Sequence, residues 1–167
     1  SVACGCRQQH FGTMTPMPAN LDAINLVKNY PKGIRAVDGV SLSLQEGQCL
    51  GLLGPNGAGN TTTVEMIEGL IPPTSGEILY RGAAVGERFR AEAGIQFQST
   101  SLQDFQTVRE TLSMFQALYP KSLDLGELAQ LCALESFWEQ NIHRVSGGQR
   151  QRLLLAMALV NNPAIVF

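Results

Sequence analysis

The sequence lacks an excess of charge of either sign, and it lacks any long apolar run. Its 12 lysine and arginine residues stand against 14 aspartate and glutamate residues, a net charge of −2, so the composition predicts no nucleic-acid partner. The longest uninterrupted apolar run is Leu153–Val160, whereas a membrane span needs about 20 such residues. With 44% hydrophobic residues in 167 positions, we expect one globular core that does not itself cross a bilayer.

A metal-binding cysteine pattern is also missing. Cys4 and Cys6, with His10 nearby, match no standard zinc spacing and lack a fourth ligand. Cys49 and Cys132 lie in apolar stretches, which predicts that both are buried thiols. The cysteines therefore indicate neither a zinc site nor an oxidising compartment.

The first half of the chain is predicted to be rich in strands. Residues 1–20 show little periodicity, and we interpret them as a disordered or non-native tail. The loose alternation that begins at Leu21 and the stricter alternation over Val37–Leu44 predict two half-buried strands. The apolar run Cys49–Leu53 predicts a strand buried on both faces, and Thr61–Leu70 predicts a helix.

The second half is predicted to be mainly helical, and its order predicts an α/β fold with an inserted helical segment at about 104–145. Thr107 and Glu110 have the spacing of a helix-starting capping box. Strands are expected at Glu77–Tyr80 and Ala93–Gln98, helices within 108–119, within 125–134 and after Ser146, and the start of a buried strand at Ala164–Phe167.

The most informative segment is a glycine-rich loop between a predicted strand and a predicted helix. It consists of Gly54, Pro55, Asn56, Gly57, Ala58, Gly59, Asn60, Thr61 and Thr62. Glycines let successive backbone N–H groups approach an anion, and the following helix adds its positive end. The hydroxyl of Thr61 is a candidate ligand for Mg²⁺. A plain glycine-rich turn is the alternative interpretation of this loop.

One residue departs from the phosphate-loop pattern Gly-x4-Gly-Lys-[Ser/Thr]. Asn60 occupies the lysine position, and that lysine normally supplies a positive charge to the β- and γ-phosphates. Asparagine donates a hydrogen bond but carries no charge. Loss of one such donor typically costs on the order of 10²–10³ in rate.

Four segments occur in an order that resembles the ATP-binding cassette (ABC) ATPases of transporters. They are the loop at Gly54–Thr62, the region of Gln98, the segment Val145-Ser-Gly-Gly-Gln149 with the apolar helix after it, and the strand at Pro163–Phe167. The resemblance covers about residues 21–167. It implies a P-loop NTPase-like α/β core with an N-terminal antiparallel β subdomain and an inserted helical subdomain.

The resemblance also implies roles for individual residues. Tyr30 is similar to the aromatic residue that stacks on adenine, and Gln98 to the Q-loop glutamine that holds Mg²⁺ or the attacking water. The signature residues Ser146, Gly147, Gly148 and Gln149 would bind the γ-phosphate of ATP held by a second subunit, in a head-to-tail dimer. Arg150 and Arg152 are expected on the exposed side of the signature helix.

As a whole, the resemblance implies the ATP-binding subunit of a membrane exporter of the ABC-2, drug-resistance type. ATP and Mg²⁺ would be its cofactors, membrane-spanning permease subunits its partners, and the cytoplasmic face of the cell membrane its location. The short interval between Gln98 and Ser146 leaves no room for the coiled-coil insertion of chromosome and repair relatives. A soluble non-transport ABC ATPase and a catalytically degenerate nucleotide-binding module remain as alternatives.

We expect this chain to be a C-terminally truncated cassette that hydrolyses ATP poorly. The Walker B acids, which the resemblance places directly after Pro163–Phe167, lie outside the sequence. Asn60 removes the lysine charge as well. The hypothesis of impaired hydrolysis rests on these two departures.

Overall fold

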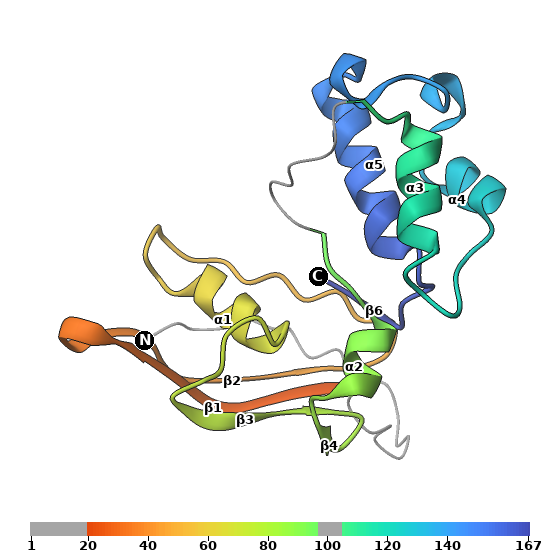
Figure 1. The fold of residues 1–167 in the computed structure, drawn as a ribbon. Coiled ribbons are helices and arrows are strands. Elements are labelled where there is room, and N and C mark those ends of the chain that lie inside the picture. The colour runs from red at the N-terminus through yellow and green to blue at the C-terminus, as the bar shows by residue number, and fades with distance from the viewer. Residues whose placement is uncertain (1–19, 97–104) are drawn as a thin grey trace. The chain divides into compact units, whose positions relative to one another are not determined.

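The computed structural model describes residues 20–96 and 105–167, and the chain divides into two compact units (Figure 1). The N-terminal unit runs to Gly86, and the C-terminal unit spans Glu87–Phe167. Each unit has a sheet of its own. The predicted tail, with Cys4, Cys6 and His10, and the predicted site residue Gln98 lie outside the described residues.

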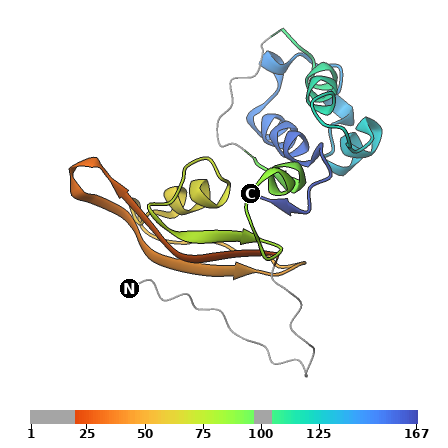
Figure 2. The same ribbon diagram turned by 60° about the horizontal axis from the view of Figure 1, so that its bottom comes forward.

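A four-stranded antiparallel sheet with strand order β2-β1-β3-β4 forms the base of the N-terminal unit. Its strands are β1 (Leu21–Tyr30), β2 (Ile34–Leu44), β3 (Ser75–Tyr80) and β4 (Ala83–Ala84). Helix α1 (Asn60–Ile67) lies over one face of this sheet (Figure 2). The structure thus confirms the first two predicted strands, the strand near Tyr80 and the helix after the glycine-rich loop.

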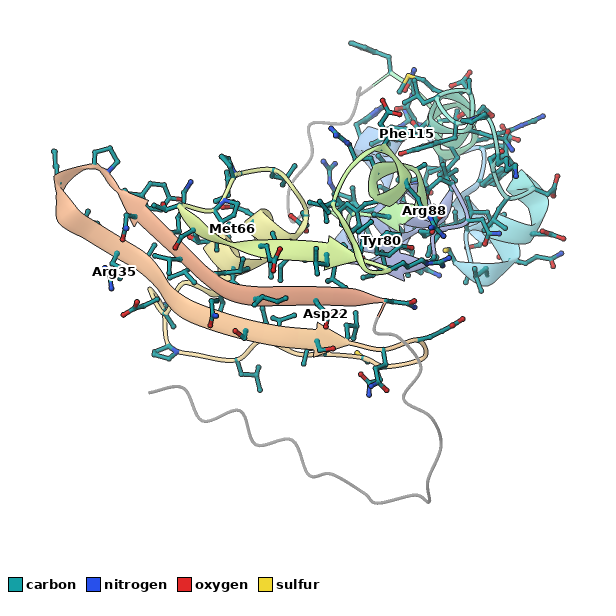
Figure 3. All side chains as sticks on the ribbon, turned by 90° about the horizontal axis from the view of Figure 1, so that it is seen from below. Asp22, Arg35, Met66, Tyr80, Arg88 and Phe115 are labelled. Carbon is teal, nitrogen blue, oxygen red and sulfur yellow. The ribbon has the colours of Figure 1, made fainter. Side chains whose placement is uncertain are left out.

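Strands β1 and β2 form a long hairpin that is closed by the short 3-10 helix η1 (Pro31–Gly33). Tyr30 pairs with Ile34 at the closed end, and Leu21 pairs with Leu44 at the open end. Figure 3 shows Arg35 near the closed end and Asp22 toward the open end. Apolar residues of the sheet and of α1 are buried in this unit: Leu21, Ala23, Leu26, Val37, Met66, Ile67, Ile78 and Tyr80.

The C-terminal unit is a helical cluster with a two-stranded parallel sheet. Its elements are α2 (Glu87–Glu92), β5 (Ala93–Gly94), α3 (Val108–Gln116), α4 (Leu125–Leu131), the 3-10 helices η2 (Glu135–Phe137) and η3 (Ile142–Arg144), α5 (Gly147–Leu159) and β6 (Ile165–Val166). Leu112 of α3, Leu128 of α4 and Leu153 of α5 are fully buried in one apolar cluster. The three predicted helices of this half are therefore confirmed.

The start of α3 is fixed by the capping box that the sequence predicts. The hydroxyl of Thr107 accepts a hydrogen bond from the Glu110 backbone N–H at 3.2 Å. In return, the Glu110 carboxylate accepts one from the Thr107 backbone N–H at 2.8 Å. These reciprocal bonds satisfy two of the orphan donors at the helix start. The Thr107 backbone N–H and the Thr107 hydroxyl, which donates to the same carboxylate at 3.0 Å, lower the pKa of the Glu110 carboxyl.

The parallel pair β5–β6 packs against the C-terminal end of α5. Ala93 pairs with Ile165 and Gly94 with Val166, and a side chain on Gly94 would collide with the backbone carbonyl of Ala158. The buried amide of Asn161 donates hydrogen bonds to the carbonyls of Ala91 and Ala93, at 3.1 and 3.0 Å. These contacts fasten the turn after α5 to β5.

The predicted buried strand at Cys49–Leu53 is wrong. This segment forms no strand, and Leu53 is 87% exposed. A strand needs a neighbour to accept its backbone hydrogen bonds, and among residues 20–96 and 105–167 the segment has no strand partner. Cys49 is exposed, contrary to expectation, whereas Cys132 is buried as predicted; burial raises the pKa of the Cys132 thiol.

Candidate phosphate-binding site

The glycine-rich loop contains a hydrogen-bonded turn at Pro55–Ala58. The backbone N–H of Ala58 donates to the carbonyl of Pro55 at 3.0 Å. Within this turn Gly57 has a φ of +85°, a left-handed conformation that residues with a Cβ rarely adopt. Residues Gly54 through Ala58 are all exposed, so the turn presents backbone groups to solvent.

Gly59 joins the loop to α1, and it packs directly against β2. Its φ is also +85°, and a Cβ at this position would collide with the backbone carbonyl of Ala36. Only glycine satisfies both conditions. The loop is therefore anchored to the closed half of the β1–β2 hairpin, because Ala36 lies just after η1.

The N-terminus of α1 carries no capping side chain. Gly59 is the N-cap and has no side chain, and the first turn contains no acidic residue. The backbone N–H groups of Asn60, Thr61 and Thr62 lie in the turn where the helix supplies no acceptor. Exposed N–H groups at the positive end of a helix are a suitable site for an anion such as phosphate.

Thr61 and Thr63 have different positions in this helix. Thr61 is exposed at the helix start, so its hydroxyl can reach a bound ion. Thr63 is buried, and its hydroxyl donates to the carbonyl of Gly59 at 2.9 Å. The sequence analysis missed Thr63, although its position one turn after Gly59 is a detectable signal for such a bond.

Asn60 lies across the loop from Gly54. A Cβ placed on Gly54 would lie 3.1 Å from the Asn60 side-chain nitrogen and 3.4 Å from its oxygen. The amide therefore reaches the base of the loop, whereas a lysine stem of four carbons would extend further. The site offers a neutral donor and acceptor at the position where the phosphate-loop pattern has a cation.

Tyr30 lies at the end of β1, on the same hairpin that anchors the loop. It pairs with Ile34, and Ala36, two residues further along β2, contacts Gly59. Successive residues of a strand are about 3.3 Å apart. Tyr30 is 38% exposed, and it lies on the hairpin whose strand β2 packs against Gly59 of the loop.

The segment Ser146–Gln149 forms the start of α5 in the C-terminal unit. The Ser146 hydroxyl accepts from the Gln149 N–H at 3.2 Å, and the Gln149 side chain accepts from the Ser146 N–H at 2.7 Å. Gly147 and Gly148 are exposed, and a Cβ on either would meet open space. Ser146, Gly147 and Gly148 are all exposed, and the N–H groups of the two glycines lie in the first turn of α5, where the helix supplies no acceptor.

Gln96, which precedes the undescribed segment that contains Gln98, is fixed at two points. Its backbone N–H donates to the carbonyl of Phe167 at 2.9 Å, which extends the β5–β6 pairing. Its side-chain amide donates to the Gln151 side chain of α5 at 3.3 Å. This bond links the end of β5 to the helix that begins at Ser146–Gln149.

Arg152 is partly exposed, and its side chain also makes contacts within the C-terminal unit that the sequence did not predict. Its guanidinium donates to the carbonyl of Ala133 at 2.7 Å and lies 5.0 Å from the centre of the Phe137 ring. It therefore satisfies a backbone carbonyl just after α4 and joins α4 to α5. Arg150 is only partly exposed.

A family profile described as ABC transporter matches residues 37–167. This chain belongs to the ABC transporter family. The match includes the whole loop Gly54–Thr62 and the segment Ser146–Gln149. The expected family and fold class are thereby confirmed, as a P-loop ATPase fold with an N-terminal antiparallel sheet.

Curated relatives of this ABC chain include both exporters and importers by name. "Nod factor export ATP-binding protein I" of Burkholderia orbicola is 37% identical over 156 residues, which cover 89% of this chain and 51% of the relative. "Spermidine/putrescine import ATP-binding protein PotA" of Trichodesmium erythraeum is 34% identical over 144 residues, 81% of this chain and 37% of the relative. The chain spans about half or less of the length of these relatives.

Solved ABC cassettes have the same fold. The structure of cbiO1 from Clostridium perfringens, part of the ABC transporter complex cbiONQ, matches with a TM-score of 0.76 at 26% identity, over 90% of this chain and 64% of that one. The cassette MJ0796, solved as a dimer bound to ADP and Pi, matches with a TM-score of 0.73 at 28% identity, over 87% and 72%. Within residues 20–96 and 105–167, no helix of the ABC chain is long and apolar enough to cross a membrane.

The donor set around the loop fits a magnesium ion that is bound mainly through phosphate. Mg²⁺ usually takes one or two protein oxygens and completes its shell with water and substrate phosphates. Thr61 offers one exposed hydroxyl at the loop. In the described part of the chain, no group of three His, Cys, Asp or Glu side chains could hold a metal by itself.

Proposed function

We propose that this chain is the ATP-binding subunit, or part of it, of an ABC-type membrane exporter. The observation that carries the proposal is the uncapped start of α1 behind a loop of exposed backbone. Gly59 leaves the N–H groups of Asn60, Thr61 and Thr62 without a side-chain acceptor, and phosphate is the anion that this arrangement suits. Membership of the ABC transporter family makes ATP the nucleotide to expect.

Each predicted site residue receives a role in this proposal. The phosphates lie in the loop Gly54–Thr62, and the base stacks on the exposed ring of Tyr30. Thr61 and Gln98 hold the magnesium ion, which neutralises charge on the β- and γ-phosphates. Ser146, Gly147, Gly148 and Gln149 contact the γ-phosphate of a nucleotide held by a second ABC subunit. The partial cassette comprises residues 21–167, with its helical subdomain at about 104–145.

The partners in this proposal are a second ABC subunit and membrane-spanning permease subunits, at the cytoplasmic face of the cell membrane. The proposal of a dimer is supported by the likeness to MJ0796, which was solved as a dimer, and by the exposure of Gly147 and Gly148. The proposal of an exporter is supported by the Nod factor export relatives. No nucleic acid is among the proposed partners.

ATP hydrolysis by this chain is proposed to be impaired. Asn60 brings a neutral amide to the base of the loop, so developing charge on the transferred phosphoryl group lacks one cation. The same observation favours a second candidate, a catalytically degenerate nucleotide-binding module. Robust phosphate release by the purified chain would contradict both the impairment and this second candidate.

The experiment that tests the main proposal uses Gly148→Asp. A Cβ at Gly148 meets open space, and an acidic residue in the first turn of α5 favours the helix dipole, so the variant should fold and melt slightly higher. Its carboxylate would repel a phosphate brought by a second subunit. We expect MgATP to shift the wild-type chain toward a dimer in analytical ultracentrifugation, while Gly148→Asp binds nucleotide but stays monomeric.

The control is Gln130→Glu, which adds the same charge at an exposed position of α4 in the same unit. It should dimerise like the wild type. If the wild-type chain binds no MgATP in titration calorimetry, the proposed function is wrong. If Gly148→Asp dimerises normally, the proposed role of the signature segment is wrong.

A further inference from the structure

Lys28 lies beside the Tyr30 ring, and the sequence analysis assigned it no role. Its ammonium nitrogen is 5.5 Å from the centre of the ring, within the range of a cation–π interaction. Both residues belong to β1, near the closed end of the hairpin. The cation is therefore part of the immediate surroundings of the aromatic surface proposed to receive the base.

The Lys28 ammonium is held in place by the segment that leads into β3. It donates to the carbonyl of Pro72 at 2.6 Å. The same segment is bound to β1 by two further hydrogen bonds, from the Thr74 N–H to the Val27 carbonyl at 2.8 Å and from the Asn29 N–H to the Thr74 hydroxyl at 3.0 Å. A cation restrained in this way loses little further freedom when a ligand binds.

The charge of Lys28 is not neutralised by a carboxylate of the described residues. Its two contacts are the Pro72 carbonyl and the Tyr30 ring. Arg35, the neighbouring cation on β2, is paired instead with Asp38 at 2.9 Å. Among the described residues, the ammonium of Lys28 therefore contacts a carbonyl and an aromatic ring but no anionic group.

We propose that Lys28 is a positioning residue for the nucleotide base, acting through Tyr30. The inference rests on the proposed function, in which Tyr30 stacks on the base of ATP. The ammonium is attracted to the negative face of the aromatic ring and so fixes the plane of Tyr30. The exposed part of the ring then offers a preformed surface for a purine, and no ring rotation has to be frozen when the base binds.

Comparing the binding of two ligands distinguishes the positioning of the base by Lys28 from a general attraction of its charge for phosphate. ATP carries a base, whereas inorganic tripolyphosphate carries the same kind of phosphate chain without one. Lys28→Met removes the charge and keeps a long apolar side chain. We expect it to weaken ATP binding about 2- to 5-fold, the effect of an exposed cation–π contact, and to leave tripolyphosphate binding unchanged.

A double-mutant cycle with Tyr30→Ala tests whether Lys28 acts through the ring. In the Tyr30→Ala background, Lys28→Met should have no further effect on the ATP dissociation constant. Lys28→Arg, which keeps a cation that can stack on the ring, should retain the wild-type affinity. The matched control is Lys32→Met, the same substitution at an exposed position of η1 in the same hairpin, which should bind ATP like the wild type.

The outcomes distinguish this inference from the proposed function. If ATP binds but the two substitutions are additive, or tripolyphosphate binding falls together with ATP binding, then Lys28 acts by another route and the inference is overturned alone. The same holds if Lys28→Arg binds as weakly as Lys28→Met. If neither ATP nor tripolyphosphate binds the wild-type chain, the proposed function fails. Should Lys28→Met unfold, Lys28→Gln, which also removes the charge, replaces it in the comparison and in the cycle with the same expected outcomes.

Discussion

Replacing Asn60 with lysine should tighten ATP binding while it destabilises the ligand-free chain. Position 60 is the first residue of α1, next to an N-cap that has no side chain. A lysine there faces the positive end of the helix dipole, which costs about 0.3–1 kcal/mol without ligand. With phosphate in the loop, the same ammonium makes a charge-assisted hydrogen bond that contributes about 1.5–3 kcal/mol. The ATP dissociation constant should therefore fall about 10- to 100-fold.

Titration calorimetry with MgATP measures the first effect, and thermal unfolding without nucleotide measures the second. We expect the ligand-free melting temperature of Asn60→Lys to fall by about 1–4 °C and the increase produced by saturating MgATP to exceed that of the wild type. The control is Ser43→Lys, which adds the same charge at an exposed position of β2 away from Ala36 and the loop. An unchanged dissociation constant in Asn60→Lys would refute the assignment of position 60 to the phosphate site.

Three further substitutions test the packing and the charges of the C-terminal unit. Ala133→Gly should raise the free energy of unfolding by roughly 0.5–1 kcal/mol, because Ala133 has a φ of +51°; a lower urea midpoint would contradict this. Gly94→Ala should lower the free energy of unfolding by about 1–3 kcal/mol, because the added Cβ collides with the carbonyl of Ala158. The control is Gly147→Ala, whose Cβ meets open space and should not destabilise the chain. Equal urea midpoints for the two variants would refute this packing. Glu110→Gln should make the free energy of unfolding depend less steeply on pH in the acid range. The backbone N–H and side chain of the α3 N-cap lower the pKa of Glu110 below its ordinary value of 4.5, so this carboxylate stabilises the fold above its unfolded pKa and ceases to do so as the pH falls through its lower folded pKa. Thermal unfolding across the acid range should therefore show a shallower loss of stability in Glu110→Gln than in the wild type.

The helix starts of the C-terminal unit could be predicted from the sequence because their signals are local. Thr107 and Glu110 form the expected capping box, and Ser146 and Gln149 form another at the start of α5. Each box depends on residues three positions apart in the chain. No distant partner has to be known in order to predict it.

Elements that depend on distant partners could not be predicted in the same way. Cys49–Leu53 has the composition of a buried strand, but composition does not say which strand will accept its backbone hydrogen bonds. Arg152 has the sequence environment of a surface charge, yet it satisfies the carbonyl of Ala133 from a different helix. The collision that requires glycine at position 59 involves Ala36, which no local pattern connects to the loop.

The starts of α1 in the N-terminal unit and of α5 in the C-terminal unit are capped in opposite ways. Helix α5 is capped by its own Ser146 and Gln149 side chains, so it needs no ligand in order to form. Helix α1 has eight residues and no capping side chain; a helix of this length is marginal by itself and depends on the packing of Met66 and Ile67. An anion at its N-terminus would supply the missing acceptors. Nucleotide binding should therefore stabilise α1 and its loop, while α5 presents Ser146–Gln149 as a surface that is already formed.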